Sequence, residues 1–512
     1  MRLGSVCLTT LFLQGAAIGL AAAATPTPPP QPVTYEEFGA KGDGQTNDME
    51  AIEQAHAFAN REKRPVRADD TKTYYIGTIK RSAIIKTDTD FGKAHFVIDD
   101  RDVFKERGKP VFIVDSSHRP YKLTDLAPLK RNQTNIGQTL KQPALIRLTD
   151  ANVKRYIRYG ANQNNGSSQT DVILVDRDGN IDMKAPLIWD FNAYTDVTVT
   201  PIDEQLLTVS GGIFTTIANQ APSNYTYYGR NITVRRSNVR ITGLRHEVTG
   251  ELDHGAPYNG FLAVNGCANV TIERCVLTGR KTYVTIGSAK RPVSMGSYDL
   301  TANSAINVTY RDCTQTNDIL DRTYWGIFGS NYCKNLVYDG CVLSRFDAHM
   351  GVANATIRNS RLGHMGINAI GTGTFLVENS TVQSYALINL RSDYGSTWEG
   401  DFIIRNCTFI SSGSLINGNY SGKHDFGYPC FMPQRITVDG LRVQDGEPRD
   451  NHHGLPIFAN FNKAYDSDAY VEKFPYHKTE EVILRNVTTT SGKPLRLSDN
   501  AFMFKDVKVV RD

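Results

Sequence analysis

Acidic, basic and aromatic residues recur in short groups along the middle of this 512-residue chain. The acidic and histidine candidates for catalysis are Asp318, Asp321, Asp347, His349 and His364. The candidates for binding a substrate are Lys281, Tyr283, Arg322, Arg391, Asp393, Tyr394 and Trp398. Two neighbouring carboxyl groups can act as acid and base in breaking a glycosidic bond. Aromatic rings can stack on sugar rings, and arginines can bind carboxylates. These residue types therefore indicate chemistry on a carbohydrate.

A repeated frame of seven residues predicts how these groups are positioned. Each copy begins with a polar residue, usually Asn, continues as an alternating apolar strand and ends with Cys or Ser. The copies start at Asn231, Asn269, Asn307, Asn335, Asn354, Thr374 and Asp401, roughly 20 to 40 residues apart. Short strands at such uneven spacing predict an all-β fold, a single-stranded right-handed parallel β-helix. A β-propeller would need a repeated block of four strands, which the sequence lacks.

Like residues stack on successive coils of such a helix, about 4.8 Å apart. We therefore expect an asparagine ladder at one turn, formed by Asn231, Asn269, Asn307, Asn335 and Asn354. We expect an interior stack of small apolar residues, formed by Cys275, Cys313, Cys341 and Cys407. The polar groups that follow each frame would form one stripe, with Asp318 and Asp347 on neighbouring coils.

The ends of the chain differ from this repeat. Residues 1–24 have the charge, apolar run and small residues of a cleavable signal peptide, which predicts a secreted or periplasmic protein. Residues 25–32 are a Pro-rich tether, and residues 33–512 are the β-helix domain. Within it, residues 33–65 form an N-terminal cap with a helix from about Asp48, 66–230 form early coils with insertions, and 231–512 form regular coils and the C-terminal end. We expect no membrane span, because no later stretch is long and apolar enough. The net charge of +4, without a Lys/Arg run, argues against a nucleic-acid partner.

The stretch Phe38-Gly39-Ala40-Lys41-Gly42-Asp43-Gly44-Gln45-Thr46-Asn47-Asp48, followed by Ala51-Ile52, resembles the start of the pectate-lyase-like β-helix superfamily. That superfamily includes glycoside hydrolase family 28 and the pectate lyase 3 domain. The family-28 hydrolases carry N-T-D, D-D, G-H-G and R-I-K on successive coils. The corresponding segments here are Thr316-Asn317-Asp318, Phe346-Asp347-Ala348-His349, Gly363-His364-Met365-Gly366 and Arg391-Ser392-Asp393.

The resemblance implies catalytic or binding roles for Asp318, Asp347, His364 and Arg391. None of the four family motifs is intact in this chain. The second aspartate of the pair is missing, an extra residue separates the two glycines, and Asp393 replaces the final lysine. The superfamily therefore indicates the fold more strongly than it indicates galacturonate as the substrate.

Three functions follow from the polar stripe, each with a polysaccharide or oligosaccharide as partner. The first is a glycoside hydrolase that uses paired aspartates and needs no cofactor or metal. The second is a polysaccharide lyase, with Lys281, His349 or Tyr283 as the base and arginines neutralising a uronate. Asp318, Asp321 and Asp347 could then hold Ca²⁺. The third is a non-catalytic, glycan-binding β-helix like a phage tailspike.

Overall fold

A computed structural model describes Met1 and residues 31–511, except residues 412 and 448–452. The signal peptide and almost all of the tether that the sequence predicts lie outside these described residues. Within the described part, no helix is long and apolar enough to cross a membrane.

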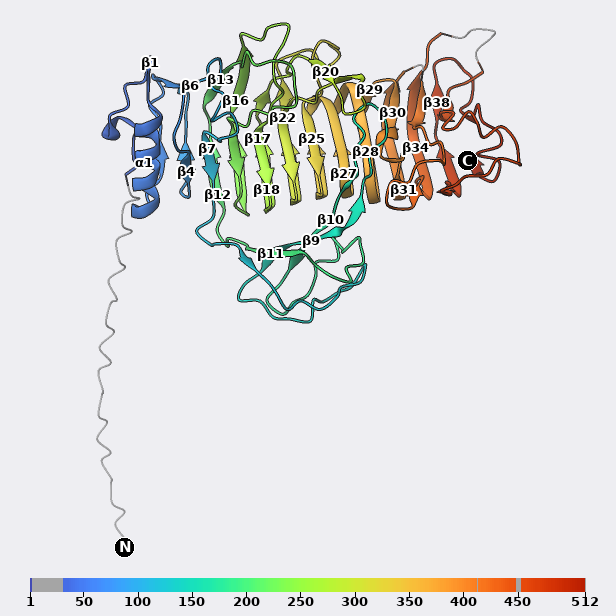
Figure 1. Ribbon diagram of the computed structural model, residues 1–512, viewed down its shortest axis with the longest axis horizontal. Helices are drawn as coiled ribbons and strands as arrows, with labels where there is room; N and C mark the ends of the chain where they lie inside the picture. The colour runs from blue at the N-terminus through green and yellow to red at the C-terminus, as the bar shows by residue number, and fades with distance from the viewer. Residues whose placement is uncertain (2–30, 412, 448–452, 512) are drawn as a thin grey trace. The chain divides into compact units, whose positions relative to one another are not determined.

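The N-terminal cap forms as the sequence predicts, with a helix at the open end of the strand stack (Figure 1). It comprises the 3-10 helix η1 (Glu36–Phe38), strand β1 (Asp43–Asn47) and helix α1 (Met49–Glu62). The apolar side of α1 is buried and packs against strand β4. The carboxylate of Asp48 accepts the backbone N–H groups of Lys41 and Gly42 at 2.7 and 3.0 Å, which ties the Gly-rich loop to the start of the helix. The helix thus covers core that an open β-helix would expose to water.

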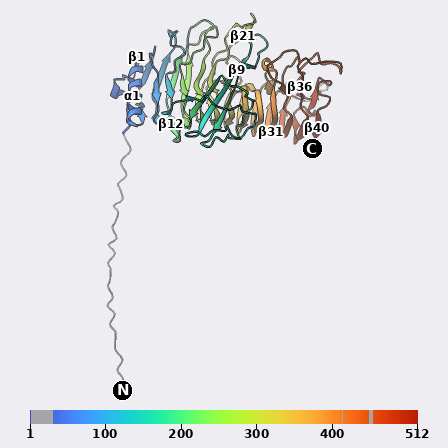
Figure 2. The same cartoon turned by 60° about the horizontal axis from the view of Figure 1, so that its bottom comes forward.

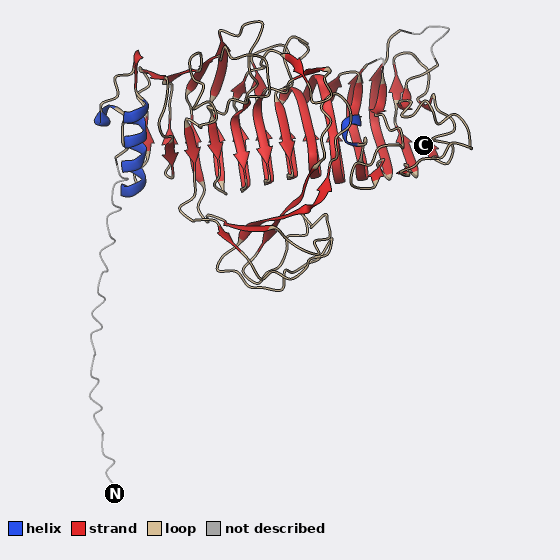
Figure 3. Cartoon of the chain, in the orientation of Figure 1, coloured by secondary structure: helices blue, strands red, loops and turns tan. Residues whose placement is uncertain are grey.

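Three stacks of parallel strands form the body of the domain (Figures 1 and 3). The first stack contains β1, β3 (Thr73–Ile76), β6 (His95–Asp99), β13 (Ile213–Ile217), β16 (Arg245–Thr249), β19 (Val276–Leu277), β24 (Thr314–Gln315), β29 (Thr381–Gln383) and β38 (Thr488–Thr489). The second contains β4 (Ala83–Ile85), β7 (Phe112–Val114), β14 (Ile232–Val234), β17 (Asn259–Asn265), β22 (Tyr298–Asn303), β25 (Phe328–Asn331), β30 (Ala386–Leu390), β32 (Ser414–Asn417), β35 (Pro456–Phe458) and β39 (Arg496–Ser498). The third contains β2 (Val66–Arg67), β5 (Thr89–Asp90), β12 (Leu207–Ser210), β15 (Val239–Thr242), β18 (Ala268–Glu273), β23 (Ile306–Arg311), β26 (Lys334–Asp339), β37 (Glu481–Arg485) and β40 (Lys508–Arg511).

Four long strands bend through more than one stack. They are β27 (Val342–Arg358), β28 (Arg361–Glu378), β31 (Trp398–Ile410) and β34 (Arg435–Gln444). The fold is therefore the right-handed parallel β-helix that the repeat predicts, with its N-terminal capping helix. Two short strand pairs lie outside the stacks: the hairpin of β20 (Val284–Ile286) and β21 (Pro292–Ser294), and the pair β33 (Cys430–Phe431) and β36 (Tyr476–His477).

The asparagine ladder forms, but its first member differs from the prediction. Side-chain amides link Asn269 to Asn238, Asn307 to Asn269 and Asn335 to Asn307 at 2.8–3.0 Å, and Asn354 continues the ladder. All five have a left-handed backbone, with φ between 56° and 61°, a conformation that asparagine tolerates better than most residues. Asn231 was predicted in this ladder wrongly. It precedes β14 in the second stack and donates to the Gly260 carbonyl. The cysteine stack is buried as expected.

Residues between the early coils form a separate lobe, which lies below the β-helix in Figure 1 and in front of the coils in Figure 2. Its antiparallel sheet has the order β10 (Ser167–Val175), β9 (Ala144–Arg155), β11 (Asp196–Pro201) and β8 (Tyr121–Lys122). The lobe has its own apolar core, which includes Ile146 and Phe191. A buried ion pair fastens it to the coils, because Lys334 Nζ of β26 lies 2.8 Å from Asp171 Oδ1 of β10.

Candidate functional site

An open groove of about 760 Å³ lies over the later strands of the second stack. Three asparagines line it in register: Asn368 of β28, Asn389 of β30 and Asn417 of β32. Asn389 donates to Asn368, and Asn417 donates to Asn389, each at 2.8 Å. We call this hollow the ladder groove. Because each amide is held by its neighbour, the row presents fixed donors and acceptors suited to hydroxyl groups.

A cluster of opposite charges lies at one side of the ladder groove. Arg391 Nη2 is 2.8 Å from Asp393 Oδ2, and Arg391 Nη1 is 3.5 Å from Asp347 Oδ2. Arg345 Nη2 contacts Asp347 Oδ2 at 2.5 Å, and Arg158 Nη2 from the lobe contacts Asp393 Oδ2 at 2.8 Å. One guanidinium group, that of Arg391, therefore holds two carboxylates near each other.

The two carboxylates differ in exposure. The side chain of Asp393 is 20 % exposed and lines the groove, whereas that of Asp347 has no exposed surface. Arg345 and Arg391 contact Asp347 and also line the groove, so they lie between Asp347 and the groove. Asp393 sits in the 3-10 helix η2 (Ser392–Tyr394), which ends at Gly395 with φ of 85°. A Cβ there would lie 2.4 Å from the sulfur of Cys430, so this turn needs glycine.

The same difference in environment separates their acidities. Burial raises the pKa of Asp347, although Arg345 and Arg391 oppose the shift. Burial also acts on Asp393, but the charges and hydrogen bonds of Arg391 and Arg158 outweigh it and lower the pKa of that carboxyl. Two carboxyl groups with pKa values shifted apart are the arrangement that acid–base catalysis uses.

His349 and Tyr394 lie beneath this cluster rather than in the groove. Burial, with the nearby arginines, lowers the pKa of His349 well below its ordinary value, so the ring is neutral at pH 7. His349 Nδ1 is 2.8 Å from Asn331 Oδ1, and its ring packs edge-on against Tyr394. Tyr394 is buried under the guanidinium groups of Arg158 and Arg391. Tyr394 therefore packs directly against the arginines of the cluster, and His349 packs against Tyr394.

The predicted stacking of Asp318 on Asp347 is wrong. Asp318 lies in the loop between β24 and β25, where its Oδ1 accepts the N–H of Leu320. The strand beside Asp347 on the preceding coil is β25, and Ser330 of that strand donates to the Asp347 carbonyl at 2.6 Å. Asp321 is half-buried in the same loop and its carboxylate accepts the N–H of Thr323. The acid pair predicted from the sequence is therefore not formed.

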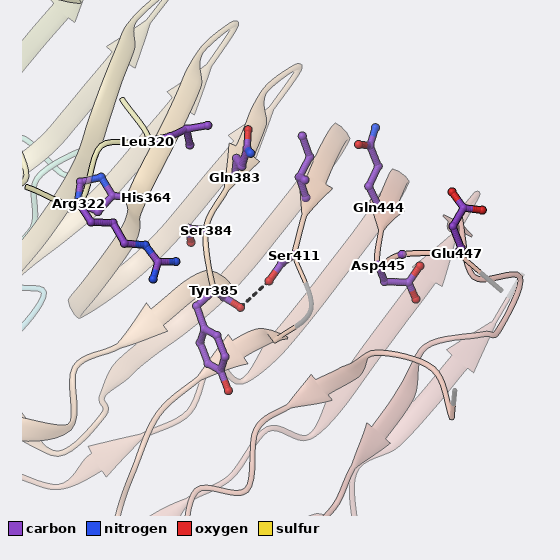
Figure 4. A pocket seen from close by; sticks show the side chains of 12 residues that line it. Leu320, Arg322, His364, Gln383, Ser384, Tyr385, Ser411, Gln444, Asp445 and Glu447 are labelled. Carbon is purple, nitrogen blue, oxygen red and sulfur yellow. Dashed lines mark hydrogen bonds between the residues drawn. The ribbon is translucent and has the colours of Figure 1, made fainter. Parts of the chain in front are cut away.

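His364 and Arg322 lie at a second hollow, the corner groove of about 710 Å³ (Figure 4). Figure 4 shows both side chains at one end of this groove and those of Asp445 and Glu447 at the other. The corner groove shares no lining residue with the ladder groove. The four residues carried over from the family-28 pattern thus do not make one centre. Asp347 and Arg391 lie together beside the ladder groove, His364 lines the corner groove, and Asp318 lies in the loop between β24 and β25 and lines neither groove.

Three further residues that the sequence suggested for substrate binding instead stabilise the fold. Trp398 is fully buried, donates its indole N–H to the Gly373 carbonyl and packs against core phenylalanines. Tyr283 is buried and donates to the Leu252 carbonyl, while Lys281 Nζ donates to the carbonyls of Glu251 and Leu252. These residues close loops or fill the core and line neither groove.

No group of three His, Cys, Asp or Glu side chains that could hold a metal ion occurs within the described ranges. Asp318, Asp321 and Asp347, the set considered for Ca²⁺, accordingly do not form such a group.

Sequence reasoning missed most of the ladder groove. The dipeptide Ile-Asn recurs at Ile367-Asn368, Ile388-Asn389 and Ile416-Asn417, and this repeat could have revealed the ladder. Arg345 could have been found as the residue two before Asp347 on the same strand. Arg158 carried no signal, because it reaches Asp393 from the lobe, 235 residues away.

The comparisons with known proteins support the fold. No family model matches the chain. The capsule KL64-specific depolymerase of Klebsiella phage P510 is 31 % identical over 121 residues, which is 19 % of this chain and only 12 % of that relative's length. The tailspike gp49 of Pseudomonas phage LKA1 matches with a TM-score of 0.52 at 12 % identity, over 93 % of this chain and 84 % of that one. The tailspike gp61 of Pseudomonas phage phi297 matches with a TM-score of 0.51 at 13 % identity, over 91 % and 84 %. The chain therefore shares the fold of these two tailspikes, which in this chain is a parallel β-helix.

Proposed function

We propose that the chain binds a polysaccharide along the ladder groove and hydrolyses its glycosidic bonds beside Arg391. The observation that carries this proposal is the pair of carboxylates, Asp347 and Asp393, which the Arg391 guanidinium group holds at the side of the ladder groove. The partial match to a capsule depolymerase agrees with a polysaccharide as the substrate.

Asp393 is the base in this scheme. It faces the groove, and the arginines that lower its pKa keep it ionised at neutral pH. An ionised carboxylate at this place can take a proton from an attacking water, as inverting glycosidases require.

Asp347 is the acid in this scheme, because burial raises its pKa and Arg345, which opposes that shift in the resting site, has to leave before the carboxylate takes up a proton. Its Oδ1 atom is buried and has no hydrogen-bond partner within the described part of the chain. Arg345 lies between Asp347 and the groove and packs near Trp325, with the guanidinium carbon 5.4 Å from the indole ring. Delivery of the proton therefore requires the Arg345 side chain to move aside when a sugar enters.

A lyase is the second candidate, and the charge of the groove favours it. Arg345, Arg391 and Lys463 line the ladder groove, against Asp393 as its one acidic lining residue among those described. A surplus of positive charge suits a uronate polymer, whose carboxylate must be neutralised before the adjacent proton can be removed.

The test is product analysis on a panel of neutral and uronate-containing capsular polysaccharides. We expect wild-type protein to release fragments with plain reducing ends and Asp393→Asn to bind the same polymer without cleaving it. Asp318→Asn is the matched control, because Asp318 lies outside the groove, and it should cleave normally. Products with unsaturated, ultraviolet-absorbing ends would show that the protein cleaves by elimination and not by hydrolysis. Binding by wild type without any product would leave only a glycan-binding role.

A further inference from the structure

A small pocket lies where the lobe meets the coils, apart from both grooves. It has a volume of about 120 Å³, roughly ten times the 10–15 Å³ that one water needs. Its lining comes from three parts of the chain: Arg131 and Trp189 from the lobe, Thr372 and Glu399 from β28 and β31, and Tyr428 and Phe431 from the segment around β33. We call it the lobe pocket. It shares no lining residue with the ladder groove or the corner groove.

Aromatic rings make one side of the lobe pocket. The rings of Trp189 and Tyr428 are 6.3 Å apart, and Tyr156 packs against Tyr428 at 5.0 Å. The guanidinium group of Arg155 lies 4.4 Å from the Trp189 ring and is itself fixed by Gln169 and the Gly427 carbonyl. The indole is thus held by its neighbours and forms a rigid surface.

The indole N–H of Trp189 is buried and has no hydrogen-bond partner among the residues that the structure describes. A buried donor without an acceptor costs free energy, and native proteins rarely leave one unpaired. Since Trp189 lines the pocket, an acceptor on a bound molecule can satisfy this donor.

Charged and hydroxyl groups make the other side. Arg131 Nη1 is 2.9 Å from both carboxylate oxygens of Glu399, and the two side chains are 40 % and 35 % exposed. An ion pair as exposed as this is weak, so its donors and acceptors can exchange to a ligand at little cost. Thr372 also lines the pocket, and its hydroxyl donates to the Glu399 carbonyl at 2.7 Å.

We propose that the lobe pocket binds one pyranose unit of a glycan without cleaving it. A sugar ring presents C–H groups to an aromatic face and hydroxyl groups to charged side chains and to the indole N–H, and the pocket offers all three. A purely apolar ligand would leave the indole N–H and the Arg131–Glu399 pair unused. The pocket contains one carboxylate, Glu399, and therefore lacks the acid–base pair that cleavage needs. This second site does not depend on catalysis in the ladder groove.

The three tryptophans of the chain allow a site-specific test. Trp398 is buried in the core, Trp325 lines the ladder groove and Trp189 lines the lobe pocket. In Trp325→Phe, the full-length protein retains Trp189 as its one tryptophan at either site. We would titrate this variant with glucose, galactose, N-acetylglucosamine and glucuronate, and follow intrinsic fluorescence. The acyclic polyol sorbitol serves as the control ligand.

We expect at least one pyranose to change the fluorescence saturably, while sorbitol does not. Adding Arg131→Met should weaken that binding about tenfold or more, since it removes charged hydrogen bonds to the sugar but keeps the tryptophan probe. Arg131→Met in the wild-type background should leave cleavage of short oligosaccharides unchanged, which separates this site from the ladder groove. The proposal is overturned if no pyranose gives a saturable change, if sorbitol gives the same change, or if Arg131→Met, folded by circular dichroism, binds as tightly as its parent.

Discussion

Replacing Asp347 with asparagine tests the charged cluster most directly. The substitution keeps the shape of the side chain and removes its charge from between Arg345, 2.5 Å away, and Arg391, 3.5 Å away. Arg391 keeps its contact with Asp393, but Arg345 loses the only acidic partner that we find for it among the described residues. The Arg345 side chain is only 3 % exposed.

The expected loss of stability follows from that burial. Removing one partner of a buried ion pair typically costs about 3–5 kcal/mol, because the other charge is left without compensation. Since one of the two arginines retains a carboxylate, we expect the lower end, about 3 kcal/mol. Turnover should fall by about 10²–10⁴-fold if Asp347 supplies the proton.

Asp318→Asn is again the matched control. Asp318 is a loop residue whose side chain accepts one backbone N–H, so its replacement should change the free energy of unfolding by less than about 1 kcal/mol. Both free energies come from urea titrations, and both rates from reducing ends released at a temperature where each variant is folded. Equal stabilities and equal rates for the two variants would refute both the buried cluster and its role in cleavage.

Three other predictions concern the Lys334–Asp171 ion pair, the row of asparagines in the ladder groove and the ion pairs of Asp393. Lys334→Met should cost about 3–5 kcal/mol in urea titrations because it leaves the buried charge of Asp171 without its cation, and adding Asp171→Asn, which removes that charge and keeps an acceptor for the Ile188 N–H, should restore part of this stability. Asn389→Leu interrupts the ladder in the groove, so calorimetry should show glycan binding weakened about tenfold while the fold persists. The pKa of Asp393 is lowered in the folded protein, so its ion pairs contribute stability above its unfolded pKa of about 4, and this is lost as pH falls through the folded value. Unfolding measured below about pH 4 should therefore show a steeper loss of stability for wild type than for Asp393→Asn.

The fold was largely predictable because its signal is periodic. Asn269, Asn307, Asn335 and Asn354 occupy one turn of successive coils, and an alternating segment that marks the buried side of the third stack follows each of them within its strand. Asn231 begins a segment with the same alternation, yet that segment is β14 of the second stack rather than a strand of the third. Alternation shows which side of a strand is buried, but it does not show which stack the strand joins.

The site was less predictable because several of its residues lie in loops and in the lobe, outside the repeated strands. Asp347 and Arg391 were found because they lie on or directly after strands that pair in register. Asp318 was placed wrongly, because the loop between β24 and β25 carries it out of the strand stack. The length of such a loop does not determine its path, so no spacing rule could have located this carboxylate.

The lobe contributes residues to both of the binding surfaces that we propose. The repeated coils place identical asparagine side chains in a row along the ladder groove. The lobe supplies Arg158, which contacts Asp393, and Trp189, which forms the aromatic side of the lobe pocket. Both surfaces therefore depend on the position of the lobe, which the buried pair of Lys334 and Asp171 fixes against β26. Because the lobe keeps its own apolar core, its sequence can change at the surface without disturbing the coils. Selection among glycans is thus expected to reside in the lobe more than in the repeat.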